Sequence, residues 1–308
     1  YYGKVYFSDT TQTASAGWVE VYDRATKKKL IHVDADELSF DLYDNPQKAY
    51  TTKIPYEEQS AILYKDFNFD GVKDFAIIDG FRNWTLGHSF KIFLASSKRF
   101  VFSDSFTELT QDNQGMFTVN AINKTISTKS KIGDTWYQYS DYIVENNKPK
   151  LIRRHTDDYE YAPFYRETIE ELKGNKMVKT TRSSLALERY HIEECFKFHV
   201  DKVNKDIILC NFYDNRLYYV ILDAKQNVEF YYPFEELRQT SDFIFYRKNG
   251  KLTFKNKDAS YTIYDKSGNI GVDITYKGKT HRWKGNAKSR RGSIGKLLKG
   301  SLDNVVYQ

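Results

Sequence analysis

Short segments in which aromatic or β-branched residues alternate with polar residues run along almost the whole chain. GWVEVYD (17–23) and KLIHVDA (29–35) flank one polar turn, and SFKIFLAS (89–96) and RFVFSDS (99–105) flank another. A period of two puts successive side chains on opposite faces of a strand, so each segment predicts a half-buried β-strand. The second half has the same texture, with turn sequences at hairpin spacing such as KNGK, DKSGN and KGKT. The chain is therefore predicted to be mainly β, with antiparallel strands.

The length of 308 residues and the distribution of charge indicate two domains. Residues 1–150 carry 18 Lys and Arg against 20 Asp and Glu, and the remainder carries 29 against 21, so a basic half follows an acidic one. PFYRETIEELKG (163–174) has glutamates placed to favour the early turns of a short helix. We predict an antiparallel β-sandwich or propeller-like domain over 1–160, a linker with a short helix over 161–180, and a second, basic antiparallel β domain over 181–308.

The stretch KDFNFDGVKDFAII (65–78) has the most specific ligand-binding pattern in the chain. Asp and Asn side chains stand at every second position, a glycine follows, and a further aspartate comes three residues after the glycine. A tight loop of this kind can turn its side chains and one backbone carbonyl toward Ca²⁺, which takes about six to eight oxygen ligands, and the glycine permits the sharp turn. The pattern predicts a calcium site formed by Asp66, Asn68, Asp70, the Val72 carbonyl and Asp74. A polar turn without a metal is the alternative.

The residues around the loop indicate which kind of calcium loop it is. The twelfth position is Ile77, where an EF-hand has a bidentate glutamate, and the flanks AILY and FAII have strand patterns. The loop is therefore predicted to join the two strands of a hairpin. Catalytic metal sites keep an open position and gather ligands from separate elements. Because this loop supplies its ligands from one contiguous segment, we expect the calcium to be structural.

The two cysteines, Cys195 and Cys210, lie on either side of a predicted turn at DKVN (201–204). Two strands that fold back about the centre of this turn place the cysteines directly opposite each other. Opposed residues on antiparallel strands have Cβ atoms close enough for a disulfide bond. The sequence predicts this bond, which fits an oxidising compartment, and two buried free thiols are the alternative.

The run YKDFNFDGVKDFAIIDGFRNWTLGHSFKIFLASSKRFVFSDSFTEL (64–109) resembles a family of small Gram-negative periplasmic proteins with one FG-GAP-like calcium loop. The similarity includes the loop, the two strands after it, and the pattern F-x-x-S-x-x-x-L from Phe102 to Leu109. It continues with G-x-x-x-Y-x-x-x-x-Y from Gly133 to Tyr142 and covers roughly residues 1–160. The second half departs from the single-domain pattern of the family.

Members of this family resemble lysozyme inhibitors and act as immunity proteins against peptidoglycan-degrading effectors of bacterial secretion systems. The resemblance implies that the chain neutralises a cognate secreted effector by stoichiometric binding, in the periplasm, after removal of an export signal. Family inhibitors insert a projecting loop into the active-site cleft of the enzyme. Two loops are candidates, and their candidate partner-binding residues are Arg82, Asn83, Trp84 and His88 in one and Trp136 and Tyr137 in the other. Packing of the aromatic side chains in the core is the alternative.

A second functional hypothesis is a calcium-stabilised module of the cell envelope that recognises cell-wall glycan or a surface protein. Enzymatic activity is not expected, because the chain has no HExxH, GxSxG or Walker-type motif. The basic C-terminal segment has only Trp283 beside it, so nucleic-acid binding is not expected either. No apolar run approaches the ~18 residues of a membrane-spanning helix, so we expect no membrane span.

Overall fold

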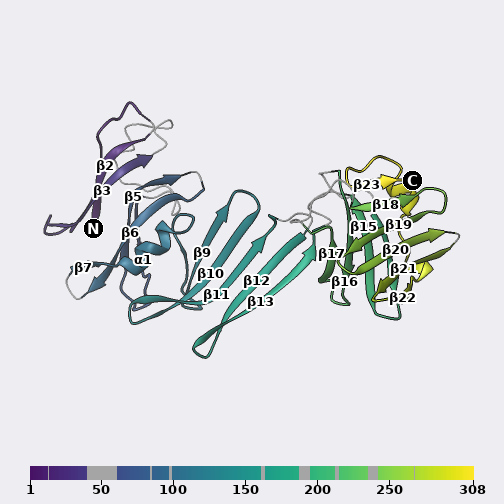
Figure 1. The fold of residues 1–308 in the computed structure, drawn as a ribbon. Coiled ribbons are helices and arrows are strands. Elements are labelled where there is room, and N and C mark those ends of the chain that lie inside the picture. The colour runs from purple at the N-terminus through teal and green to yellow at the C-terminus, as the bar shows by residue number, and fades with distance from the viewer. Residues whose placement is uncertain are drawn as a thin grey trace. The chain divides into compact units, whose positions relative to one another are not determined.

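The computed structural model describes residues 1–12, 14–39, 61–83, 85–96, 99–160, 164–186, 195–211, 215–234, 242–266 and 268–308. These residues form five β-sheets, two short α-helices and one 3-10 helix (Figure 1). The prediction of a mainly β chain with antiparallel sheets is confirmed. Within the described ranges, no helix is long and apolar enough to cross a membrane.

The chain divides into two compact units, each assembled from two segments. Unit 1 comprises Tyr1–Asp157 and Thr168–Thr180, and unit 2 comprises Asp158–Glu167 and Thr181–Gln308. The chain therefore passes from one unit to the other three times between residues 157 and 181. Neither unit is a single continuous stretch of sequence.

Unit 1 contains two small sheets whose strands follow the chain order. The first sheet consists of β1 (Tyr2–Phe7), β2 (Ala14–Tyr22) and β3 (Lys29–Ser39), and the second of β4 (Ile62–Lys65), β5 (Asp74–Asn83), β6 (Gly87–Ser96) and β7 (Arg99–Phe102). Val19 of β2 pairs with Val33 of β3, in the hairpin that the alternation predicted. Both sheets contribute to one core, in which Val19, Val33, Phe75 and Ile77 are almost fully buried.

The helix α1 (Asp104–Gln111) starts where the sequence predicted that a strand would continue to residue 105. Its Phe106 and Leu109 lie three positions apart and are buried in the unit 1 core, which a helix permits. The hydroxyls of Thr107 and Thr110 accept hydrogen bonds from the backbone amides of β6, each at 3.0 Å. These contacts with β6 hold the helix against the sheet.

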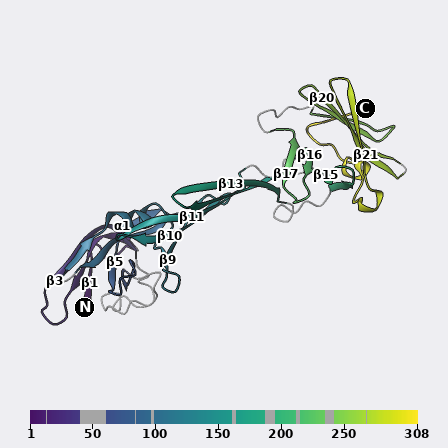
Figure 2. The ribbon, with the colours of Figure 1, turned by 90° about the horizontal axis from the view of Figure 1, so that it is seen from below.

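The third sheet has six strands in the order β13-β12-β11-β10-β9-β8, and Figure 2 shows it from below. Its strands are β8 (Thr118–Asn120), β9 (Thr125–Ile132), β10 (Trp136–Glu145), β11 (Lys148–Asp158), β12 (Phe164–Lys173) and β13 (Lys176–Leu185). The turn between β10 and β11 is the predicted ENNK, with Asn146 and Asn147 at φ values of 53° and 56°. Asparagine tolerates this left-handed conformation well, which makes it suitable for a two-residue hairpin turn.

The short helix predicted over 163–174 is wrong, because β12 occupies this stretch. The other described part of the predicted 161–180 linker belongs to β13 and to the turn between the two strands. Gly174 has a φ of +63° and, with Asn175, makes the hairpin turn. Arg182 of β13 pairs with the buried carboxylate of Glu167 on β12. The turn residues and this cross-strand pair outweigh the helix propensity of the glutamates.

Unit 2 contains a four-stranded sheet and a six-stranded sheet. The first consists of β14 (Cys195–Val200), β15 (Lys205–Asn211), β16 (Leu217–Leu222) and β17 (Val228–Tyr232). The second has the order β22-β21-β20-β19-β18-β23, with β18 (Phe243–Tyr246), β19 (Lys251–Asn256), β20 (Ala259–Lys266), β21 (Asn269–Tyr276), β22 (Lys279–Lys284) and β23 (Val305–Tyr307). The segment between β22 and β23 includes the 3-10 helix η2 (Ala287–Ser289) and α2 (Ile294–Leu297).

The sheet β14–β17 is covered on both faces. On one face Phe198 and Tyr219 pack with Phe254 and other residues of the six-stranded sheet. On the other face Tyr218 and its neighbours pack against Phe164. This is why β16, with the sequence LYYVIL, is buried at every position and does not alternate.

Candidate binding sites in the two units

The acidic loop joins β4 to β5, as its flanking sequences predicted. The Asp66 carboxylate accepts hydrogen bonds from the amides of Asp70 and Gly71, at 3.2 and 2.8 Å. The Asp70 carboxylate accepts one from the Val72 amide at 2.7 Å. Gly71 has a φ of +90°, which glycine adopts without a steric penalty. The loop side chains therefore fold the backbone into a tight turn.

Asp74 begins β5 and is fully buried. Its two carboxylate oxygens accept hydrogen bonds from the amides of Phe67 and Ala95, at 2.7 and 2.8 Å. Burial, together with the nearby carboxylates of Asp70 and Asp66, raises the pKa of Asp74 to about 6. In the described ranges, no basic side chain forms an ion pair with any of these three aspartates. A cation would stabilise the charged form of Asp74, because burial and the neighbouring carboxylates both disfavour that charge.

The carboxylate, amide and carbonyl oxygens of the loop are the kind of ligands that calcium binds. Asn68 is buried, and its amide donates to Asp70 at 3.0 Å and to Asn147 at 3.1 Å, so the loop also contacts the turn between β10 and β11. Among the described residues, Asp66, Asp70 and Asp74 are not arranged so that one carboxylate oxygen of each lies within 4.8 Å of the other two. Calcium binding therefore stays a prediction, with the ligands Asp66, Asn68, Asp70, Val72 and Asp74.

The first candidate partner loop is the tip of the β5–β6 hairpin. Arg82 and Asn83 end β5 and are exposed, and Trp84 lies outside the described residues. The Asn83 side chain accepts hydrogen bonds from the amides of Thr85 and Leu86, both at 2.8 Å. Asn83 therefore shapes the turn, in the manner common for asparagine, and Arg82 is the more available of the two for contact with a partner.

His88 differs from the other residues of this loop because it is half-buried. Its ring packs edge-on against Phe81, with 5.3 Å between the ring centroids, and burial lowers the pKa of His88. These contacts suit a residue that packs the hairpin together. They favour a structural role for His88 over the predicted contact with a partner.

The second candidate loop is the β9–β10 hairpin. Trp136 and Tyr137 are half-buried, and the Tyr137 hydroxyl donates to the carbonyl of Asp134 at 3.2 Å. Trp136 pairs across the hairpin with Ile132, which is 68% exposed. The end of this hairpin therefore combines an exposed aliphatic residue with a partly exposed indole.

The segment after α1 connects the two candidate loops by hydrogen bonds. The Gly115 amide donates to the carbonyl of Leu86, and the Gln114 side chain donates to the carbonyl of Thr85, both at 2.7 Å. The Gln114 amide donates to the carbonyl of Lys129 on β9, also at 2.7 Å. Two hairpins that are distant in sequence are therefore held in one hydrogen-bonded framework.

The two cysteines face each other in the register that the turn predicted, with Cys195 of β14 opposite Cys210 of β15. The predicted disulfide bond is absent, since both are free thiols. A hydrogen bond between the thiols lowers the pKa of Cys195, and the same bond and burial raise that of Cys210. The fold places the sulfurs for a bond, but the redox state of the surroundings decides whether it forms.

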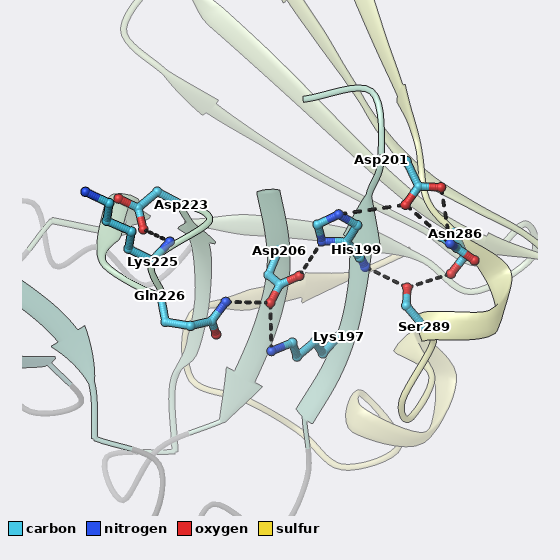
Figure 3. Close-up of polar contacts among 9 residues, drawn as sticks. All are labelled: Lys197, His199, Asp201, Asp206, Asp223, Lys225, Gln226, Asn286 and Ser289. Carbon is cyan, nitrogen blue, oxygen red and sulfur yellow. Dashed lines mark hydrogen bonds and ion pairs between the residues drawn. The ribbon is translucent and has the colours of Figure 1, made fainter. Parts of the chain in front are cut away.

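A polar network in unit 2 joins β14, β15 and the segment that contains η2 (Figure 3). His199 Nδ1 lies 2.8 Å from Asp206 Oδ1, and its Nε2 lies 3.7 Å from Asp201 Oδ1. Lys197 Nζ lies 2.9 Å from the second Asp206 oxygen. Burial raises the pKa of Asp206, but hydrogen bonds from Lys197, His199 and Gln226 outweigh it and leave the pKa lowered.

This network contains Ser, His and Asp without the geometry of a hydrolytic triad. The Ser289 hydroxyl accepts a hydrogen bond from the His199 backbone amide at 2.8 Å and donates to the Asn286 carbonyl at 2.7 Å. A triad needs a hydrogen bond between the nucleophile and the imidazole. The Asn286 side chain contacts Asp201 at 3.1 Å (Figure 3). The network therefore attaches the C-terminal segment to the sheet.

A further polar centre, around Glu20 of β2, was not identified from the sequence. Glu20 is buried and accepts hydrogen bonds from the Tyr22 hydroxyl, from Lys29 Nζ at 2.8 Å and from His32 Nδ1 at 2.8 Å. Burial raises the pKa of Glu20, but these hydrogen bonds outweigh it and lower the pKa to about 2. Glu20 and His32 are direct cross-strand partners. The sequence predicted that β2 and β3 pair, and a comparison of the polar side chains on the two strands would have placed Glu20 opposite His32.

Comparisons with known proteins place the chain in no family. No family model matches it, and no curated protein matches it. A Type IV secretion system related protein from Xanthomonas is similar in structure over 58% of this chain and 99% of its own, with 16% identity and a TM-score of 0.38. TolB from Acinetobacter baumannii is similar over 92% of this chain and 79% of its own, with 10% identity and a TM-score of 0.17. TM-scores this low give no basis for assigning a function.

Proposed function

We propose that this chain is an immunity protein that binds and inhibits a secreted peptidoglycan-degrading enzyme. The observation that carries the proposal is the hydrogen-bonded framework that joins the β5–β6 and β9–β10 hairpins in unit 1. An inhibitory surface gains affinity when its loops are ordered before binding, because less conformational entropy is lost. The resemblance of residues 1–160 to periplasmic inhibitors supports the same proposal, and it supports a periplasmic location.

Arg82 is the residue of this surface best suited to contact the enzyme. It is exposed, and its side chain forms no hydrogen bond or ion pair with any described residue. Glycoside hydrolases commonly hold two catalytic carboxylates in their cleft, and a guanidinium pairs with a carboxylate through two parallel hydrogen bonds. Such a contact would block the catalytic groups directly.

Calcium in the acidic loop would stabilise this surface without taking part in binding. The loop contacts the turn between β10 and β11 through Asn68 and Asn147, and its Asp74 accepts a hydrogen bond from the backbone of β6. The ion would neutralise the repulsion among Asp66, Asp70 and Asp74. In this proposal its effect on inhibition is indirect, through the order of the hairpins.

The proposal is tested with the full chain and a peptidoglycan hydrolase encoded next to its gene. We expect the hydrolysis of purified peptidoglycan to fall to the background at a one-to-one molar ratio. Arg82→Glu should weaken inhibition at least tenfold, while the control Arg24→Glu, at another exposed arginine, should inhibit like the natural protein. Unchanged hydrolysis in the presence of excess protein would overturn the proposal.

A cell-envelope binding module is the second candidate function, and a polar pocket in unit 1 favours it. Its partner would be cell-wall glycan, in place of an enzyme. The protein would then sediment with purified peptidoglycan in the absence of any hydrolase. Sedimentation without inhibition would favour this candidate over the immunity protein.

A further inference from the structure

A pocket of about 360 Å³ lies in unit 1 between α1 and the strands β10 and β11. This volume falls in the range of about 300 to 1,000 Å³ that is typical of small-molecule sites. The polar residues that line it include Glu108, Asp112, Asn113, Gln138, Tyr142 and Arg154. The pocket uses none of the predicted calcium ligands and none of the predicted partner-binding residues.

Two carboxylates enter the pocket from the helix side. Glu108 lies on α1, and Asp112 caps its end one turn later, so both side chains lie on the same side of the helix. Both residues are exposed, and neither carboxylate forms a hydrogen bond or ion pair with a described residue. The pocket therefore presents two free acceptors.

The strand side of the pocket supplies a guanidinium and a carboxamide. Arg154 Nη1 donates to Glu170 at 3.1 Å, and the Arg154 side chain is 39% exposed, so the rest of its guanidinium can donate to a ligand. Gln138 lies on β10, and its carboxamide forms no hydrogen bond with a described residue. Together with the two carboxylates, these groups suit a polar molecule.

We propose that this pocket binds a neutral saccharide. Each sugar hydroxyl can both donate and accept a hydrogen bond, so one molecule can donate to Glu108 and Asp112 and accept from the exposed part of the Arg154 guanidinium. A lysine ammonium has donors only, and it would lie beside the guanidinium of Arg154. An anionic ligand such as phosphate would be repelled by the two carboxylates. The carboxamide of Gln138 can supply both kinds of hydrogen bond.

The lining also offers an apolar surface to the carbon skeleton of a sugar ring. The partly buried ring of Tyr142 lies on the strand side of the pocket, and Leu109 lies on the helix side. Ligand sites commonly combine apolar walls with a few oriented polar groups. The saccharide inference rests on the second candidate function, because it uses the same pocket, and it stands apart from the inhibitor proposal, because different residues carry each.

The test titrates the full chain with triacetylchitotriose, maltotriose and cellotriose by calorimetry. We expect at least one trisaccharide to bind with a Kd in the millimolar range or tighter. The double variant Glu108→Gln/Asp112→Asn keeps side-chain shape and should weaken this binding at least tenfold. The control Asp36→Asn changes an exposed carboxylate on β3 and should bind as the natural protein does.

Three outcomes would overturn the saccharide proposal. They are no binding of any of the three sugars at about 10 mM, equal binding by the double variant, or displacement of the sugar by trilysine. Circular dichroism shows whether the double variant is folded, and Gln138→Ala provides a second variant if it is not. The double variant should still inhibit the hydrolase and Arg82→Glu should still bind the sugar, so either proposal can fail without the other.

Discussion

At the scale of single residues, Glu20 shows how cross-strand partners control a buried charge. Its three hydrogen-bond partners come from β2 and β3 and keep its pKa at about 2, below the ordinary value of 4.5. Between about pH 2 and pH 4.5, Glu20 is therefore less protonated in the folded state than in the unfolded state. The resulting stabilisation is present above about pH 4.5 and is lost as the pH falls toward 2.

Replacing Glu20 with glutamine should lower the free energy of unfolding at pH 7 by about 1 to 3 kcal/mol, because Lys29 and His32 lose their charged acceptor. The variant should also lose less stability than the natural protein between pH 4.5 and 2. Urea denaturation at a series of pH values measures both effects. The control Asp34→Asn removes the exposed carboxylate on the other side of His32, so it should change stability much less. If the stability of Glu20→Gln fell as steeply between pH 4.5 and 2 as that of the natural protein, the loss would not be due to Glu20.

At the scale of elements, the β4–β5 hairpin is where calcium should act. Calcium that binds only the folded state stabilises it by about 2.7 kcal/mol at a free concentration of 100 Kd. We expect calcium to raise the Tm of the natural protein and a chelator to reverse the rise. Asp70→Ala should abolish this response, and the control Asp36→Ala should keep it. Equal calcium responses in both variants, measured by differential scanning fluorimetry, would exclude the loop as the site.

The β14–β15 hairpin holds two thiols in the register of a disulfide bond. Exchange with oxidised glutathione should join Cys195 to Cys210, release two molecules of reduced glutathione and lower the mass of the protein by two hydrogens. A bridge that closes a loop of about 15 residues stabilises by up to about 3 kcal/mol. Intact-mass spectrometry and urea denaturation measure the two effects. Cys210→Ser should prevent both the mass change and the stabilisation. If both thiols of the natural protein still react with an alkylating reagent after treatment with oxidised glutathione, the hairpin does not accept the bond.

At the scale of the whole molecule, neither unit is continuous in sequence. Phe164 belongs to unit 2 although residues of unit 1 follow it in the chain, and its ring lies 4.1 Å from that of Tyr231. The segment predicted as a linker over 161–180 is therefore divided between the units, with Asp158–Glu167 in unit 2 and Thr168–Thr180 in unit 1. The turn sequences in this region are local features, so they did not reveal that the chain passes repeatedly between the two units.

Phe164→Ala should destabilise unit 2 by about 3 to 5 kcal/mol, because it opens a cavity beside the buried face of β14–β17. Scanning calorimetry of the full chain should show a lower transition temperature for unit 2. Phe102→Ala is the matched control, since Phe102 is 42% exposed and lies in unit 1. An unchanged thermogram for Phe164→Ala would show that the ring does not belong to the unit 2 core.

The sequence by itself determined the mainly β fold, the β4–β5 loop, several hairpin turns and the register of the β14–β15 hairpin. Alternating side chains and turn residues act between neighbours in the chain, so Cys195 could be paired with Cys210 and the ENNK turn could be placed. Only the tertiary structure decided that residues 164–173 form a strand, that the segment after α1 joins two hairpins, and that a pocket lies between α1 and β10–β11. Each of these features depends on contacts between elements, which no local pattern encodes.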